Sequence, residues 1–153
     1  MAVQMKVMFV AFDPKSDRFT VLLKDLENRY VLPIWIGPFE ANAIALRLRK
    51  IDSHRPMTHD LLCNILTVFN SEIVKVEVVE LRDKTFYAVI HIRSDGKEIA
   101  LDSRPSDAIA IALRAGAPIY ANESVLTTAE TFRLDQLQEW LKSLKPGDIK
   151  YRA

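Results

Sequence analysis

Two groups of strand-like segments, separated by helical sequence, constrain the fold of this chain most strongly. Each group contains three short segments rich in β-branched and aromatic residues, and turn sequences with Asp, Asn, Ser, Pro or Gly join them. The predicted strands are residues 5–12, 19–24 and 30–36 in the first group, and residues 73–81, 85–93 and 98–101 in the second. Neighbouring strands joined by short turns pair antiparallel, so the sequence predicts two antiparallel β-meanders.

The remaining sequence is mostly helical. Apolar residues recur three and four positions apart, which is typical of helices with one buried face. The predicted helices are residues 38–51, 59–69, 106–114, 123–130 and 134–144, and a short strand is predicted at residues 118–121. Because the strands are grouped and do not alternate with helices, the pattern indicates an α+β fold with helices packed against the two meanders.

Local signals refine these boundaries. Thr58 and Ser106 are expected to be N-cap residues, and Gly116 is expected to end the helix that precedes it. Pro33 lies inside a predicted strand, which indicates a sheet edge or a bulge. Trp35 and Phe39 flank a Gly-Pro break and are expected in the core or at an interface rather than as base-stacking residues.

The length suits one compact domain. We expect residues 1–130 to form the α+β domain and residues 131–153 to form a C-terminal helical tail. Cys63 is the sole cysteine, which excludes an internal disulfide and a zinc site built on several cysteines. We expect it to be a small buried residue. The sequence contains neither a membrane-length apolar run nor a signal-peptide pattern, so a cytoplasmic protein without membrane contact is predicted.

Charge limits the functional classes. The formal net charge is +1, which argues against a strongly basic nucleic-acid-binding protein. A local basic patch or a metal-dependent nucleic-acid enzyme stays compatible with this value, because a sum hides the distribution of charge.

A short polar sequence occurs twice, at residues 55–60 (RPMTHD) and 102–107 (DSRPSD), each time where a helix is expected to begin. The first turn of a helix carries unpaired N–H groups and the positive end of the helix dipole. Such a position suits helix capping, and it equally suits the binding of an anion or a metal–phosphate pair. Spacing alone favours capping and internal ion pairs.

The functional interpretation assigns a role to each polar residue near these helix starts. Carboxylates are the ligands that Mg²⁺ and Mn²⁺ prefer, guanidinium groups bind phosphate, and histidine transfers protons near neutral pH. The candidate metal ligands are Glu40, Asp102 and Asp107; the candidate catalytic residues are His59, Asp60 and Arg104; the candidate substrate-binding residues are Arg55, Arg104 and Ser106.

At these residues the chain resembles the bifunctional nuclease (BFN) domain family. The resemblance covers roughly residues 4–130, and its motifs occur in family order: residues 32–37 (LPIWIG) with Glu40 and Ala41, residues 55–62 (RPMTHDLL), residues 85–88 (TFYA) and residues 102–110 (DSRPSDAIA). By position, it carries over Glu40, His59, Asp60, Asp102, Arg104 and Asp107.

The resemblance implies a compact α+β domain that forms a homo-oligomer, dimer or higher, and a metal-assisted phosphodiester hydrolase acting on DNA or RNA. Two hypotheses therefore stay open. The first is a nuclease that uses Mg²⁺ or Mn²⁺. The second is a non-catalytic module that binds a ligand or a protein, in which the same polar residues have structural roles.

Overall fold

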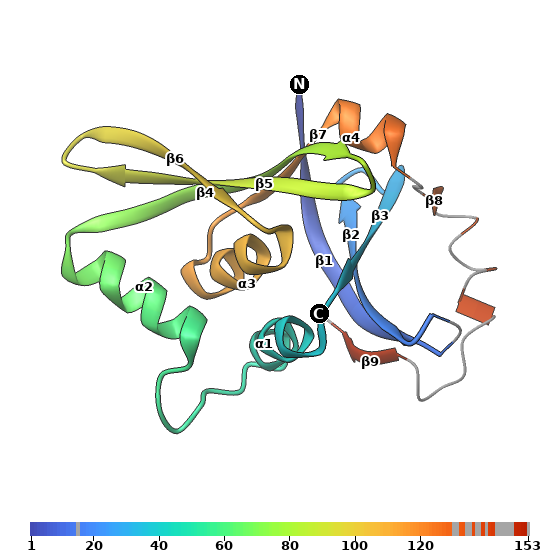
Figure 1. Cartoon of the computed structure of the whole chain (residues 1–153), viewed down its shortest axis with the longest axis horizontal. Coiled ribbons are helices and arrows are strands. Elements are labelled where there is room, and N and C mark those ends of the chain that lie inside the picture. Colours follow the sequence, from blue (N-terminus) through green and yellow to red (C-terminus); the bar gives the residue numbers. More distant parts are fainter. Residues whose placement is uncertain are drawn as a thin grey trace.

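A computed structural model describes residues 1–14, 16–129, 132–133, 136, 139, 141–142 and 149–152. Its strands are β1 (Ala2–Asp13), β2 (Arg18–Asp25), β3 (Tyr30–Ile36), β4 (Ser71–Arg82), β5 (Thr85–Ser94), β6 (Lys97–Ser103), β7 (Ile119–Asn122), β8 (Phe132–Arg133) and β9 (Ile149–Arg152). Its helices are α1 (Pro38–Leu48), α2 (Thr58–Val68), α3 (Pro105–Ala115) and α4 (Glu123–Thr128). Figure 1 shows their arrangement.

Both predicted meanders are confirmed. Strands β1, β2 and β3 pair antiparallel in sequence order, and so do β4, β5 and β6. The short strand β7 joins them, since it pairs antiparallel with β1 and parallel with β4. The described strands therefore form one mixed sheet in the order β6-β5-β4-β7-β1-β2-β3-β8, with β9 added beside β1. The α+β prediction is correct, and the two meanders are halves of one sheet.

Turn chemistry explains the tight hairpins of the second meander. Asp83 and Lys84 both have positive φ, and so do Asp95 and Gly96. Two central residues with positive φ match the right-handed twist of the flanking strands. The first of these hairpins, between β4 and β5, places Lys84 at an exposed tip.

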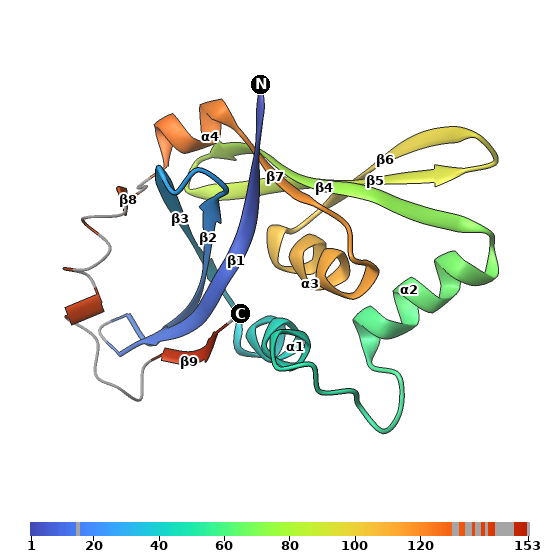
Figure 2. The same cartoon turned by 180° about the vertical axis from the view of Figure 1, so that it is seen from behind.

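Helices α1, α2 and α3 lie on one side of the β4–β6 half of the sheet, as the two opposite views show (Figures 1 and 2). Helix α3 packs on β4 and β5 and is itself contacted by α1 and α2. The core between them contains Ile44 of α1, Ile109 of α3 and Val76 of β4, all of them buried. Helix α2 contributes no buried residue.

The predicted N-caps are each wrong. Met57 is the N-cap of α2 and Arg104 is the N-cap of α3, and neither Thr58 nor Ser106 caps its helix. Pro105 explains the shift in α3, because proline suits the first helical position and keeps the preceding residue extended. In α2, the Asp60 carboxylate accepts a hydrogen bond from the Met57 N–H at 2.9 Å and satisfies the helix start instead.

Pro33 lies in β3, which pairs with β2 along its length and with β8 only at Tyr30 and Val31. Pro33 is therefore beside a sheet edge in the part of the chain that the structure describes, as predicted. Strand β9 was not predicted; it pairs with β1 through residues 9–11. The predicted tail helix, residues 134–144, falls mainly outside the described residues.

Candidate active site

A cleft of about 870 Å³ opens between α2, the inner face of β5 and β6, and the start of α3. Most of its wall is apolar and comes from these elements, for example Leu62 and Ile65 of α2 and Ile90 of β5. Polar side chains gather at one end. Those predicted from the sequence that line the cleft are Glu40, His59, Asp102, Arg104 and Asp107.

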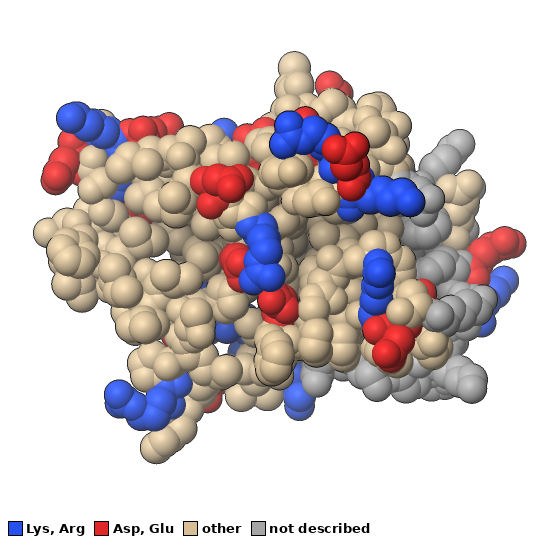
Figure 3. Space-filling model, in the orientation of Figure 1, with Lys and Arg blue, Asp and Glu red and all other residues tan. Residues whose placement is uncertain are grey.

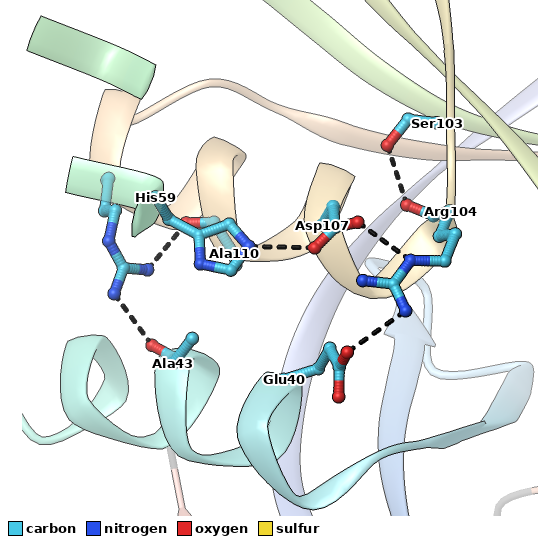
Figure 4. Close-up of polar contacts among 8 residues, drawn as sticks. Glu40, Ala43, His59, Ser103, Arg104, Asp107 and Ala110 are labelled. Carbon is cyan, nitrogen blue, oxygen red and sulfur yellow. Dashed lines mark hydrogen bonds and ion pairs between the residues drawn. The ribbon is translucent and has the colours of Figure 1, made fainter. Parts of the chain in front are cut away.

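Four of these side chains form one chain of contacts (Figure 4). His59 Nε2 lies 2.9 Å from Asp107 Oδ1, and Arg104 Nε donates to Asp107 Oδ2 at 2.9 Å. The Arg104 guanidinium also reaches Glu40, with 3.0 Å between Nη1 and Oε1. Three helices therefore meet at the Arg104–Asp107 pair: α2 supplies His59, α3 supplies Asp107 and its N-cap Arg104, and α1 supplies Glu40.

Exposure differs along this chain of contacts. The side chains of His59, Asp107 and Glu40 are 12%, 28% and 18% exposed, whereas Arg104 is 65% exposed. The carboxylates and the imidazole are thus largely sheltered, and Arg104 is the most exposed member of this chain of contacts.

Electrostatics keeps Asp107 ionised. Partial burial by itself raises the pKa of this carboxyl, but hydrogen bonds from His59 and Arg104, together with the Arg104 charge, outweigh burial and hold the pKa below its ordinary value. The same bond to Asp107 raises the pKa of Arg104 further above its already high value. An ionised Asp107 fixes the orientation of the His59 ring and leaves Nδ1 as the nitrogen that is not bound to Asp107.

Arg114 holds the start of α2 in place. Its side chain is 8% exposed, and Nε donates to Asp60 Oδ1 at 2.7 Å. Its other nitrogens donate to the carbonyls of Ala110 in α3 and Ala43 in α1, at 2.9 and 3.0 Å. One guanidinium thereby joins three helices directly beside His59.

Asp60 takes part in this clamp and does not line the cleft. Burial raises its pKa, yet the Met57 N–H and Arg114 outweigh that effect and the pKa is lowered. Its two oxygens are occupied by the helix start and by Arg114. Both carboxylate oxygens of Asp60 are therefore engaged within the fold, and the catalytic role expected from the sequence stays a prediction.

Gly37 makes room for Glu40. A Cβ atom added at Gly37 would collide with the Glu40 carboxylate, so the carboxylate occupies the space that a side chain would need. The absence of a side chain at position 37 lets Glu40 fold back over the helix start and reach Arg104. This explains a glycine that the sequence analysis treated only as a break in the chain.

The other predicted residues are placed differently. Asp102 lies on β6 at the cleft and forms no ion pair with a described residue. Ser106 is 6% exposed and faces a neighbouring cavity, and Arg55 lies exposed in the loop before α2 and does not border the cleft. Within the described ranges, no three His, Cys, Asp or Glu side chains are grouped as a ready metal centre.

Arg114 was not among the residues predicted from the sequence. A basic residue in the last turn of an apolar helix suits the helix dipole, so the pattern offers an ordinary explanation. Its burial against Asp60 depends on how α2 and α3 pack, which spacing along the chain does not reveal.

Cys63 is half-buried, and burial raises the pKa of its thiol, which agrees with the expected packing role.

None of the described helices combines the length and the apolar character needed to cross a bilayer.

Comparison with known proteins gives a family match. A model of the bifunctional nuclease domain matches residues 21–133. Two proteins of Mycobacterium tuberculosis, one from each of two strains and both named only as uncharacterized, are 32% identical over 163 aligned residues. Each alignment covers 96% of this chain and 98% of the relative.

Proposed function

The chain belongs to the bifunctional nuclease domain family, and from this premise we propose that it hydrolyses phosphodiester bonds of DNA or RNA with a divalent metal ion. One observation supports the proposal most: His59 of α2, Glu40 of α1 and the Arg104–Asp107 pair at the start of α3 form one chain of contacts in a single cleft. Helix capping alone does not require that convergence.

The roles follow from the contacts. Arg104 is the exposed cation, and its planar fork binds two phosphate oxygens at once. His59, oriented by Asp107, transfers a proton between the reacting oxygen and solvent. The ionised Asp107 stabilises the imidazolium that forms during this transfer, and it needs no proton of its own.

The metal ion is also a proposal. Mg²⁺ and Mn²⁺ bind one or two carboxylates and fill the remaining positions with waters and substrate phosphate, so a group of three protein ligands is not required. Glu40 and Asp107 both face Arg104, and Asp102 borders the same cleft. When Arg104 turns to a substrate phosphate, these carboxylates lose their cationic partner and suit a metal ion. Once bound, such an ion supplies Lewis-acid stabilisation of the phosphate.

Cleavage assays with purified protein test the proposal. Single- and double-stranded DNA and RNA are incubated with Mg²⁺, Mn²⁺ or EDTA. We expect metal-dependent cleavage, reduced at least about 100-fold by Asp107→Asn and by His59→Gln. The matched control is Asp95→Asn, because Asp95 is an exposed hairpin residue with positive φ, which asparagine tolerates.

A further arm of this assay tests Glu40 without altering it. Gly37→Ala pushes the Glu40 carboxylate away from Arg104, while the folded backbone keeps an ordinary φ at position 37. We expect a folded protein with weakened cleavage. Absence of cleavage with both metals, or full activity in folded Asp107→Asn, contradicts the nuclease proposal.

The non-catalytic alternative has its own support, since Asp107 and Glu40 are already engaged in internal ion pairs. In that case Asp107→Ala lowers the free energy of unfolding by about 1–2 kcal/mol, as for a lost cap or dipole partner, and there is no activity to lose. Metal-dependent cleavage that disappears in a folded Asp107→Ala protein separates the two functions.

We also propose that the chain forms a homo-oligomer through α2 and β6. Helix α2 and its C-cap expose a continuous set of large apolar side chains, and β6 is an open sheet edge among the described strands. The exposed apolar residues are Leu61, Leu62, Ile65, Val68 and Phe69 on the helix and Ile99 and Leu101 on the strand. Such a surface is typical of a contact between proteins.

A further inference from the structure

A second cavity, of about 350 Å³, lies on the other side of Arg104. Its border comes from the start of β2, the end of β3, the β4–β5 hairpin and the start of α3. We call it the basic pocket and define it by Arg18, Trp35, Lys84 and Arg104, the side chains that give it its chemical character.

The charged side chains that line the basic pocket are Arg18, Lys84 and Arg104. Arg104 is paired with Glu40 and Asp107, whose carboxylates lie on its cleft side. Arg18 and Lys84 are exposed, and within the described residues neither forms an ion pair. On the face of the molecule shown in Figure 3, acidic and basic side chains are interspersed. A pocket lined by two cations without an ion-pair partner, beside a third cation that is paired, suits a polyanion.

Trp35 adds an aromatic surface to these cations. It lies on β3 and is 44% exposed, so it is not a core residue. A positively charged groove beside an exposed aromatic ring is the arrangement with which proteins bind single-stranded nucleic acids, because phosphates meet the cations and an unstacked base stacks on the ring. The bases of a duplex are already stacked inside the helix and cannot use Trp35 in this way.

Arg104 borders both the basic pocket and the cleft. Phe39 stands at the cleft, next to Glu40, and is 86% exposed. The shared guanidinium therefore lies between two cavities that each carry an exposed aromatic ring. A strand passing over Arg104 meets cations on one side and the His59–Asp107 pair on the other.

We propose that the basic pocket is a second subsite of the same binding path, and that it holds the phosphates and one unstacked base of a single-stranded nucleic acid. The proposal rests on the nuclease function above, since it places the scissile phosphate at Arg104. It names the substrate class, a single strand rather than a duplex, and it assigns phosphate binding to Arg18 and Lys84 and base stacking to Trp35.

Binding without cleavage tests the two cations. A fluorescently labelled 12-nucleotide oligo(dT) is titrated in EDTA and followed by anisotropy. We expect the double variant Arg18→Ala/Lys84→Ala to bind at least about tenfold more weakly at low salt. The slope of the logarithm of the binding constant against the logarithm of the salt concentration should become shallower by about 1.4, because each single-strand phosphate contact contributes about 0.7. The matched control is Lys6→Ala/Lys97→Ala, which removes two exposed cations elsewhere and should bind as the wild type does.

Fluorescence tests the stacking. The chain has two tryptophans, so Trp140→Phe leaves Trp35 as the sole indole. We expect oligo(dT) to quench that fluorescence. Trp35→Ala should weaken binding about fivefold, and Trp35→Phe should restore most of it. Phe69→Ala should have no effect, because Phe69 is more exposed than Trp35 but borders neither cavity.

Each remaining outcome has one meaning. If the wild type binds and cuts nucleic acid but the double cation variant and Trp35→Ala behave normally, the subsite is wrong and the nuclease proposal stands. If those variants weaken binding but no metal gives cleavage, the subsite stands and the nuclease proposal fails. Failure of the wild type to bind oligo(dT), equal affinity for a 12-base-pair duplex, or equal competition by thymidine monophosphate overturns the single-strand path.

Discussion

Replacing Arg114 by methionine tests the clamp that joins α1, α2 and α3. Methionine keeps much of the apolar stem and removes the three hydrogen bonds to Asp60, Ala110 and Ala43. We expect a folded but less stable protein in which the start of α2, with His59, is less firmly held. Because Asp60 follows His59 directly in α2, loosening the Arg114–Asp60 contact should also loosen His59 in the cleft.

The magnitude follows from the partners. A hydrogen bond between charged groups contributes about 1.5–3 kcal/mol, and we take the lower half because Asp60 is 32% exposed and keeps its bond from Met57. The carbonyls of Ala110 and Ala43 each keep a helical N–H partner. Losing the two Arg114 hydrogen bonds to these carbonyls therefore adds about 1 kcal/mol in total. The free energy of unfolding should fall by about 2.5–3 kcal/mol, which corresponds to about 5–12 °C in Tm for a domain of this size.

Urea unfolding followed by circular dichroism measures this change. Arg93→Met is the matched control, since its ion pair with Glu72 is exposed on both sides and should contribute about 0–1 kcal/mol. A double-mutant cycle with Asp60→Asn isolates the pair and should give a coupling free energy of about 1 kcal/mol or more. A loss below about 0.5 kcal/mol for Arg114→Met, or no coupling with Asp60, refutes the clamp.

Two further predictions concern acid stability and assembly. The buried Asp25 accepts hydrogen bonds from the N–H groups of Arg29 and Tyr30 and from the Arg29 side chain; burial raises its pKa, but these bonds outweigh burial and lower it. The ionised Asp25 therefore stabilises the fold above about pH 4, and this stabilisation is lost as the pH falls below that value. Asp25→Asn should flatten the acid side of a plot of the urea midpoint against pH. An unchanged plot contradicts this prediction. In light scattering at micromolar concentration the wild type should exceed the mass of one chain, whereas Ile65→Glu should lower that mass; a monomeric wild type is the contrary result.

The strands could be predicted because their signals are local. Alternating apolar residues and turn sequences with positive φ, such as Asp95-Gly96, act over a few neighbouring positions and mark each hairpin. Residues 30–36 were predicted with both boundaries correct. Strand β9 was missed because its partner is residues 9–11, far away in the sequence, and no local signal marks such a pairing.

The sequence predicted which residues line the candidate site better than it predicted what each of them contacts. Glu40, His59, Asp102, Arg104 and Asp107 were all selected from helix-start chemistry, and all of them line one cleft. Asp60 was selected in the same way but does not line the cleft, because its carboxylate contacts Arg114, and that contact depends on helix packing. The same limit applies to Trp35, whose exposure depends on which strands lie beside β3.

The position of β1 in the sheet sets an order of events during synthesis of the chain. Residues 2–5 pair with β7, and residues 9–11 pair with β9. Because both partners are synthesised more than one hundred residues after β1, these parts of β1 stay unpaired in the early nascent chain. Until then one edge of β1 offers unpaired N–H and C=O groups to any other extended chain. Nascent chains of this protein should therefore depend on late residues, or on a chaperone, to protect their earliest strand from aggregation.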